Sequence, residues 1–159
     1  MSDQFVLVTG ASSGIGLALA EELAGRGYDL AICSESDRLQ NAAHRLEGFG
    51  AQVYVWQENL ATREGVARLW KKVENVGRDL DIACINAGVG VGGLFAETDL
   101  DAELNMIELN CSGAVQLAKY VVRHMSSRNR GRISTRPRKR LAFPSRIASA
   151  TNSATPAFP

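Results

Sequence analysis

Short apolar runs that alternate with helix-like stretches constrain this sequence more than any other feature. The stretches between the runs repeat their apolar residues at helical spacing and end at or near glycines. A strand–helix alternation with short turns requires a parallel sheet with helices on both faces, so the sequence predicts an α/β fold. The expected strands are FVLVTG at 5–10, YDLAIC at 28–33, AQVYVW at 51–56 and LDIACINAG at 80–88, and the expected helices are 15–25, 37–49 and 62–76.

The second part of the chain continues this pattern for a limited distance. A glycine-rich loop at 90–93 precedes a short helical segment at 99–104 and a long helix at about 105–125. GRI at 131–133 then opens as a strand does, and no periodicity follows it. We therefore expect the sheet to be truncated after the start of its fifth strand.

Composition argues against several classes of protein. No apolar run reaches the roughly 18 residues that span a membrane, and the sequence enters a strand too early to leave room for a secretory signal. Cys33, Cys84 and Cys111 are odd in number and far apart, so we expect reduced, buried thiols in a cytoplasmic protein. His44 and His124 have no partner at metal-ligand spacing, so we expect surface histidines and no metal site.

The octapeptide TGASSGIG, Thr9–Gly16, joins the first expected strand to the first expected helix. Gly10 permits a tight turn, Gly14 lets the backbone approach a pyrophosphate, and Gly16 allows the helix to pack closely on the strand. The amide groups at the N-terminus of the helix then face the anion. The alternative is a glycine-rich turn without a ligand. The other residues of the motif expected to contact the ligand are Ser12, Ser13 and Ile15.

Polar residues also follow the other expected strands at their carboxyl ends, where open α/β sheets bind ligands. Glu35 follows the second strand, where a carboxylate can accept a hydrogen bond from a ribose 2′-hydroxyl and repel a 2′-phosphate. Asn59 and Leu60 follow the third strand, where adenine would lie. These positions predict a site for NAD, with NADP as the alternative cofactor. The residues expected to contact it after the fourth strand are Asn86, Ala87 and Gly88.

In this order the motifs resemble the classical short-chain dehydrogenase/reductase family over residues 5–133. TGASSGIG matches the family's cofactor motif without a gap, and NAG at 86–88 matches its second motif, although Ile85 stands where an Asn is usual. Asn59 stands where the family has an Asp that contacts adenine. Asn110, in IELNCSG, matches the family's active-site Asn, whereas on its own an Asn within a helix would be interpreted as structural.

The resemblance implies a Rossmann-type, doubly wound parallel sheet whose first strands lie in the order 3-2-1-4. It also implies homo-oligomers and hydride transfer between a nicotinamide cofactor and a small alcohol or ketone. The family's chemistry requires a Ser after the fifth strand and a Tyr-x-x-x-Lys pair, and Asn110 would anchor a water that links this Lys to solvent. No such pair is present: Tyr28, Tyr54 and Tyr120 are followed four residues later by Ile, Glu and His. The alternative is a dinucleotide-binding module without catalytic activity.

The two parts of the chain also differ in charge. Residues 1–108 carry 8 basic and 17 acidic side chains, whereas residues 109–159 carry 10 basic and no acidic side chains. The basic end has three interpretations: an arm that binds nucleic acid, a genuine disordered tail, or a shifted reading frame. An arm would neutralise phosphates, but this segment lacks the interleaved aromatic residues that add stacking. We therefore do not expect nucleic acid as a partner.

A shifted reading frame agrees with the codons that this segment could have. ISTRP at 133–137 can be encoded ATC TCA ACA CGT CCT C, and the same bases read from the third one give Leu-Asn-Thr-Ser-Ser. That is a strand ending in paired serines, as the family has after GRI. We expect residues 1–133 to form an incomplete Rossmann domain, and 134–159 to be an irregular basic tail, out of frame. The sheet would then expose an edge of its strand at 80–88.

Overall fold

Five parallel strands form one sheet in the order β3-β2-β1-β4-β5. The computed structural model describes residues 4–135 of the chain. This arrangement confirms the expected α/β class and the expected order of the first four strands. The strands are β1 (Phe5–Thr9), β2 (Asp29–Ser34), β3 (Val53–Gln57), β4 (Leu80–Ile85) and β5 (Arg132–Thr135).

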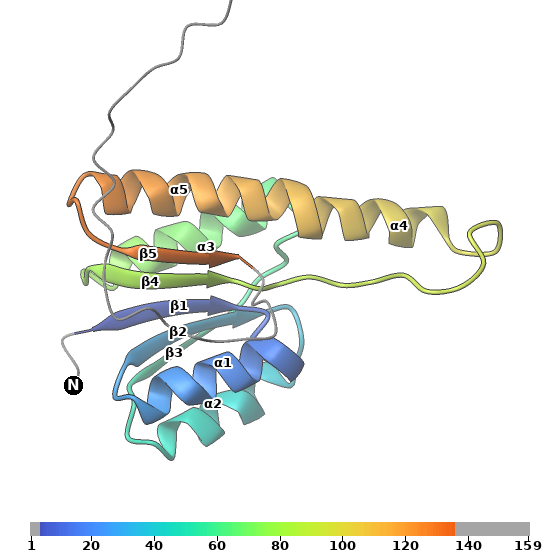
Figure 1. Cartoon of the computed structure of the whole chain (residues 1–159). Coiled ribbons are helices and arrows are strands. Elements are labelled where there is room, and N and C mark those ends of the chain that lie inside the picture. Colours follow the sequence, from blue (N-terminus) through green and yellow to red (C-terminus); the bar gives the residue numbers. More distant parts are fainter. Residues whose placement is uncertain (1–3, 136–159) are drawn as a thin grey trace, which may run out of the picture.

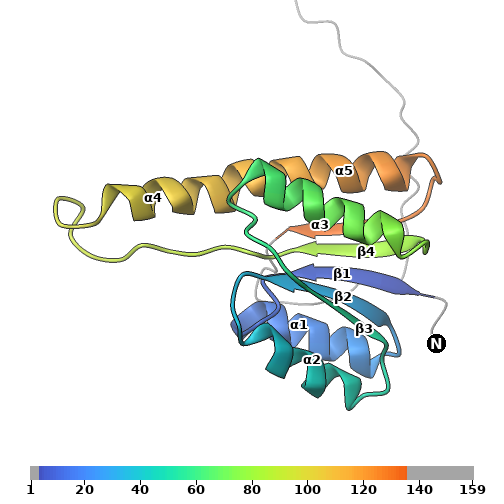
Figure 2. The ribbon, with the colours of Figure 1, turned by 180° about the vertical axis from the view of Figure 1, so that it is seen from behind.

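Helices cover both faces of the sheet, as Figures 1 and 2 show: α1 and α2 lie on one face, and α3 and α5 on the other. The side chains of β1 alternate between two cores, because successive residues of a strand point to opposite faces. Phe5 and Leu7 pack with α3 and α5, whereas Val6 and Val8 pack with α1 and α2. These helices are α1 (Gly14–Gly25), α2 (Leu39–Glu47), α3 (Arg63–Asn75) and α5 (Ala114–Ser126).

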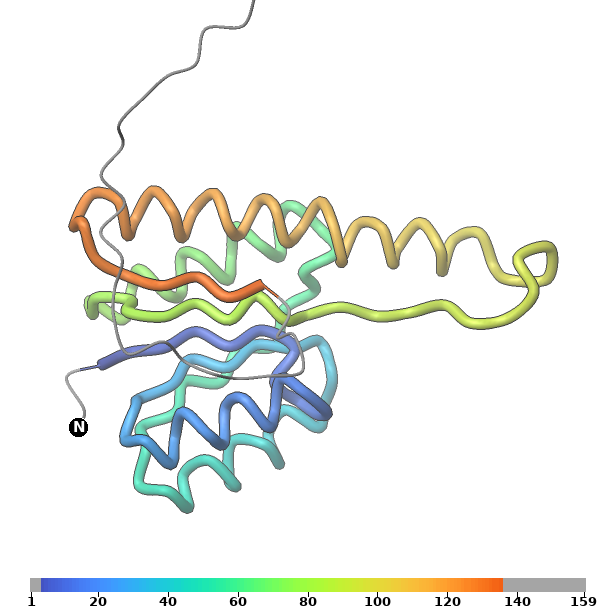
Figure 3. Tube along the Cα trace, in the orientation of Figure 1, coloured from blue at the N-terminus to red at the C-terminus, as the bar shows by residue number. Residues whose placement is uncertain are grey.

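A long helix in three segments leads into β5. It begins with α4 (Leu100–Ile107), passes through a π-helical turn, η1 (Glu108–Gly113), and continues without a break as α5. We expected a boundary near residue 104, but the change in the hydrogen-bond pattern comes later and does not interrupt the helix. The segment 89–107, which we call the arm, extends away from the sheet and its covering helices (Figure 3).

The structure corrects three expectations. β5 extends through Ser134 to Thr135 and pairs with β4, so the edge of β4 is covered, and among residues 4–135 the last strand on this side of the sheet is β5. Cys111 is exposed, although Cys33 and Cys84 are buried free thiols as expected. His124 is half-buried, with its ring 5.6 Å from that of Trp70, whereas His44 is exposed. The remainder of the expected tail, residues 136–159, lies outside the described residues.

Candidate functional site

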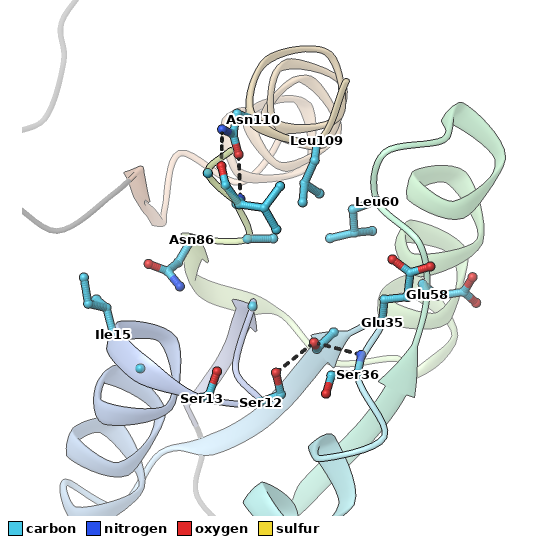
Figure 4. A pocket seen from close by; sticks show the side chains of 17 residues that line it. Ser12, Ser13, Ile15, Glu35, Ser36, Glu58, Leu60, Asn86, Leu109 and Asn110 are labelled. Carbon is cyan, nitrogen blue, oxygen red and sulfur yellow. Dashed lines mark hydrogen bonds between the residues drawn. The ribbon is translucent and has the colours of Figure 1, made fainter. Parts of the chain in front are cut away.

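A cavity of about 750 Å³ opens at the carboxyl ends of the strands (Figure 4). This is the edge of the sheet where the strand order reverses around β1 and β4, which is where open α/β sheets bind ligands. The residues that line the cavity are Gly10, Ser12, Ser13, Gly14, Ile15, Ser34, Glu35, Ser36, Glu58, Leu60, Asn86, Ala87, Gly88, Val89, Gly90, Leu109 and Asn110.

The glycine turn between β1 and α1 forms one wall of this cavity. Gly10 and Gly14 have φ angles of 68° and 57°, in the left-handed region that favours glycine. A side chain on Gly10 would also meet the backbone of Ala87, at 2.8 Å from its Cα. Ser13 precedes α1 without a capping side-chain hydrogen bond, so the first amide groups of this helix have no capping side chain among residues 4–135. This helix end can therefore bind an anion.

Thr9 connects the turn to the end of β4, a role that the sequence did not reveal. Its buried hydroxyl accepts hydrogen bonds from the backbone N–H groups of Asn86 and Ala87, each at 3.0 Å, and donates to the carbonyl oxygen of Cys84 at 3.4 Å. The Asn86 side chain also donates to the Thr9 carbonyl oxygen at 3.4 Å. These bonds hold the Asn86–Gly88 segment against the glycine turn, so two predicted motifs share one wall of the cavity.

Serines join the glycine turn to the end of β2. The Ser34 hydroxyl donates to the Ser12 hydroxyl at 3.0 Å and accepts from the backbone N–H of Ser36 at 3.2 Å. Glu35, between them, lines the cavity and accepts a hydrogen bond at Oε1 from the amide of Asn59 at 3.1 Å. The carboxylate therefore lies at the carboxyl end of β2, on the wall of the cavity.

Glu58 is a buried acid of the cavity wall with two cationic partners. Its carboxylate accepts hydrogen bonds from Lys72 at 2.7 Å and Arg68 at 2.9 Å, both on α3. Burial raises the pKa of Glu58, but these hydrogen bonds and positive charges outweigh burial, so the pKa lies below its ordinary value. Glu58 therefore ties the end of β3 to α3 as an ionised carboxylate.

Asn110 lies on the π-helical turn and holds the segment that follows β4. Its amide nitrogen donates to the Val89 carbonyl oxygen at 2.8 Å, and its Oδ1 accepts from the Val89 N–H at 3.0 Å. The two residues are 21 positions apart, so this Asn does not make the local helix bond that its sequence position allowed. π-Helical turns are frequent at functional sites. The turn brings Asn110 to the cavity wall.

The cavity brings most of the predicted site residues together. Gly16 and Asn59 do not line it, although Gly16 packs against the Gly10 carbonyl and Asn59 contacts Glu35. The individual roles of the site residues stay predictions. Lining residues that the sequence reasoning missed are Ser34, Ser36, Glu58, Val89, Gly90 and Leu109. Most of them adjoin a predicted residue at a strand end, and that adjacency was the only signal for them.

Neither a membrane span nor a metal cluster is found in the part of the chain that the structure describes. No helix there is long and apolar enough to cross a membrane. No group of three or more His, Cys, Asp or Glu side chains among residues 4–135 is arranged to hold a metal ion.

The fold and the cavity together define a Rossmann-like α/β protein. A sequence profile described as short chain dehydrogenase matches residues 4–135, so the chain belongs to the short-chain dehydrogenase family. Bovine (Bos taurus) retinol dehydrogenase 8 is 34% identical over 135 residues, which cover 80% of this chain and 42% of the relative. The chain thus spans less than half of that protein's length.

Solved structures of the family superpose well on this chain. L-Sorbose reductase from Gluconobacter frateurii, complexed with NADPH and L-sorbose, matches with a TM-score of 0.76 and 35% identity over 85% of this chain and 52% of its own. An alcohol dehydrogenase from the archaeon Thermococcus sibiricus, complexed with 5-hydroxy-NADP, matches with a TM-score of 0.76 and 32% identity over 83% of this chain and 57% of its own. Nicotinamide dinucleotides are therefore bound by relatives of the same fold.

Proposed function

We propose that this chain binds NAD(P) and belongs to an oxidoreductase that transfers hydride between the nicotinamide and an alcohol or carbonyl group of a small molecule. One observation carries the proposal: the cavity at the carboxyl ends of the strands combines a glycine turn at a helix N-terminus with an acid at the end of β2. Relatives with this fold hold an NADP derivative or NADPH, which supports a nicotinamide dinucleotide as the cofactor here.

In this proposal, each part of the dinucleotide would take a separate position on the cavity wall. Gly14 and Ile15, at the start of α1, would hold the pyrophosphate. Glu35 would accept a hydrogen bond from the adenosine ribose, beside Leu60. Asn86–Gly88 and Asn110 would lie near the nicotinamide, which supplies the hydride chemistry when bound. We assign Asn110 to the active site on its match to the family's active-site Asn.

Glu35 favours NAD over NADP in this proposal. A carboxylate beside a 2′-phosphate repels it, and like charges brought together can cost several kcal/mol. Ser13 supplies no compensating positive charge from the glycine turn. Arg38, four residues from the end of β2, is the exposed side chain that could offset this repulsion. Tighter binding of NADP than of NAD would contradict the assignment.

The second candidate is a dinucleotide-binding module without catalytic activity. It is favoured by a specific observation: within the 159 residues no Tyr is followed four positions later by Lys. General acid–base catalysis contributes about 10²–10⁴-fold to a rate, so we expect this chain to show no enzymatic hydride transfer by itself. If the chain turned over an alcohol or ketone robustly, and the Asn110→Ala change abolished this turnover, the inactive module would be ruled out in favour of the enzyme.

We further propose that residues 1–133 are an incomplete dinucleotide-binding domain of a cytoplasmic protein, and that residues 134–159 are read out of frame. The family match ends at residue 135, next to this boundary, which supports the proposal. Sequencing the coding DNA tests it directly, because a shifted frame would reveal a Tyr-x-x-x-Lys pair downstream. A salt-dependent mobility shift with nucleic acid would instead favour the third interpretation, a nucleic-acid-binding tail.

Two substitutions of Gly14 test cofactor binding. A Cβ on Gly14 would meet nothing within 4 Å, and Asn and Asp both tolerate its positive φ. Gly14→Asn and Gly14→Asp therefore have nearly the same shape and differ in charge. Because a side chain at Gly14 would stand where the backbone approaches the pyrophosphate, we expect calorimetry to show at least about tenfold weaker NAD binding for both variants than for the unchanged chain. Gly14→Asp should bind more weakly than Gly14→Asn, because its carboxylate also repels the pyrophosphate. Binding of NAD by Gly14→Asp as tight as by the unchanged chain, or no binding by the unchanged chain, would contradict the proposal.

A further inference from the structure

The arm carries an apolar surface that the rest of the described chain does not cover. No residue of α4 is buried. Single exposed apolar residues are ordinary on a protein surface, whereas several on one projecting segment indicate an interaction surface. The large apolar side chains of the arm that are at least half exposed are Val89, Leu94, Phe95, Leu100, Leu104 and Ile107.

The arm is also acidic. It carries Glu97, Asp99, Asp101 and Glu103 and no Lys, Arg or His. None of these four carboxylates forms an ion pair with a residue between 4 and 135. Because complementary charge favours an interface, a partner that covers this surface should combine basic and apolar side chains.

One segment of this chain has that combination. Residues 136–143, which lie outside the described residues, have the sequence RPRKRLAF. Four of these eight side chains are basic, none is acidic, and Leu141 and Phe143 are large and apolar. Attraction between opposite charges needs no selected fit, so it acts in this chain even if the segment is read out of frame.

The segment begins beside the base of the arm. Thr135, at the end of β5, pairs with Ile85 at the end of β4, and the arm starts four residues after Ile85. The two strands are parallel, so the chain leaves β5 at the edge of the sheet from which the arm extends (Figure 3).

The length of the segment matches the distance to be covered. The stretch 86–93 leads from the end of β4 to Leu94 and Phe95 in eight residues. Residues 136–143 are equally many, and eight extended residues span at most about 26–29 Å. A tethered segment also meets its site at a high effective concentration, which makes an intramolecular contact more favourable than capture of a separate partner.

We propose that residues 136–143 of this chain dock on the arm. The basic side chains lie beside Glu97, Asp101 and Glu103, and the apolar ones pack against Leu94 and Phe95. This contact is independent of cofactor binding and goes beyond it. It identifies the arm as an interaction surface for a basic, apolar peptide segment, with the chain's own segment as its occupant.

Cross-linking at Lys139 tests which surface the segment touches. Lys139 is the last lysine of the sequence, and the one before it is Lys119. A carbodiimide activates a carboxylate, the Lys139 amine displaces the activated group to form an amide, and the reagent leaves as its urea. At low protein concentration, peptide mapping should place most Lys139 cross-links on Glu97, Asp101 and Glu103. The exposed acids Glu47 and Glu64, on α2 and α3, are the internal comparison.

A matched pair of double variants tests the charge contact through cleavage by trypsin after Lys139 and Arg140. Glu97→Gln/Asp101→Asn removes two charges from the arm, and Glu47→Gln/Glu64→Gln removes two elsewhere. An exposed ion pair shifts an equilibrium by about 1.5- to 5-fold, so the arm variant should be cleaved about threefold faster than the unchanged chain. The control should differ from it by less than about 1.5-fold, and about 1 M salt should abolish the contrast because it screens exposed charges.

A second pair tests the apolar contact. Phe95 and Val115 are both well exposed, at 84% and 66%, so neither change should damage the fold. Phe95→Ser should speed cleavage by about twofold or more, also in high salt, because it removes apolar contact area. Val115→Ser, on α5, should leave the rate unchanged.

Each contrary outcome overturns the proposal in a different way. Equal cleavage rates for the two double variants would exclude the charge contact. Lys139 cross-links as frequent on Glu47 and Glu64 as on the arm would mean that the segment has no preferred surface. Cross-links between two chains that increase with protein concentration would assign the arm to the segment of a second copy. None of these measurements involves NAD, so failure of the proposed function would leave their results unaffected.

Discussion

Two regions of the molecule differ in burial: the sheet with its covering helices, and the arm at residues 89–107. In both regions the helices begin at ordinary local signals, such as capping residues. Every residue of β1 and β4 is buried, and α1 to α3 each bury four or more side chains. In the arm, α4 has an N-cap at Asp99 that accepts from the Ala102 N–H, yet none of its residues is buried. Phe95 and Leu100 are 84% and 65% exposed.

This difference shows that local signals are enough to start a helix but not to give it a covered face. Most of the stability of helices in proteins comes from packing an apolar face, rather than from propensity or capping. The arm has apolar side chains that contribute little to the two cores, while those of α1 and α2 are packed. Its exposed apolar surface is of the kind that marks an interaction site or a liability to aggregation.

The reactivity of the cysteine thiols should differ most between the covered sheet and the π-helical turn η1, which follows the arm. Burial raises the pKa of Cys33 to about 12, with a further contribution from the charge of Glu58, and burial raises that of Cys84 to about 11. Only the thiolate reacts, so at pH 8 both should react with a disulfide reagent at least about 100-fold more slowly than an ordinary exposed thiol. Cys111, exposed on η1, should react first.

Peptide mapping after a brief exposure to the reagent measures this contrast. We expect the label on the Cys111 peptide, with the other two thiols labelled only in denaturant. Rapid labelling of Cys33 in buffer would mean that β2 opens readily, and the distinction between a covered sheet and an uncovered arm would not hold.

A matched pair of leucines measures the same contrast as stability. Leu23 on α1 is 1% exposed, whereas Leu104 on α4 is 51% exposed. Leu23→Ala should lower the free energy of unfolding by about 2–5 kcal/mol, because it removes buried methyl groups and leaves a cavity. Leu104→Ala should change it by no more than about 0.5 kcal/mol. Urea denaturation followed by circular dichroism gives both values.

Equal losses of unfolding free energy from Leu23→Ala and Leu104→Ala would mean that the arm is as well covered as the sheet. A large loss for Leu104→Ala would show that the apolar face of α4 is buried in solution, for example against a second copy of the chain. Repeating the denaturation at several protein concentrations would identify that case, since association makes stability concentration-dependent.

The helices, the strands and the edge of the sheet at which the cavity opens could be predicted from the sequence, because their signals are local. A glycine turn, an acid after a strand and a cap before a helix each depend on neighbouring residues. The contacts that complete the site are not local: Thr9 bonds Asn86 and Ala87 across 77 and 78 positions, and Asn110 bonds Val89 across 21. The π-helical turn and the exposure of Cys111 depend on how the long helix packs, which no short pattern records.

The smallest expected effect concerns Glu58, which joins β3 to α3. Glu58→Gln should lower the free energy of unfolding at pH 7 by about 1 kcal/mol, a modest value because Arg68 and Lys72 are partly exposed. Its pKa is lower in the folded chain than the ordinary 4.5, so the unfolded chain binds more protons as the pH falls. The contribution of the ionised Glu58 carboxylate to the free energy of unfolding is therefore present above about pH 4.5 and is lost as the pH falls below that value.

Comparing Glu58→Gln with the unchanged chain from pH 7 to pH 3 tests this sign. The two unfolding free energies should converge as the pH falls, since the unchanged carboxylate also becomes neutral. Glu64→Gln, on the exposed first turn of α3, is the control and should change stability by only a few tenths of a kcal/mol, about the size of a helix-end charge effect. If the difference between the two unfolding free energies widened toward low pH, burial and not the two cations would determine the direction of the Glu58 pKa shift.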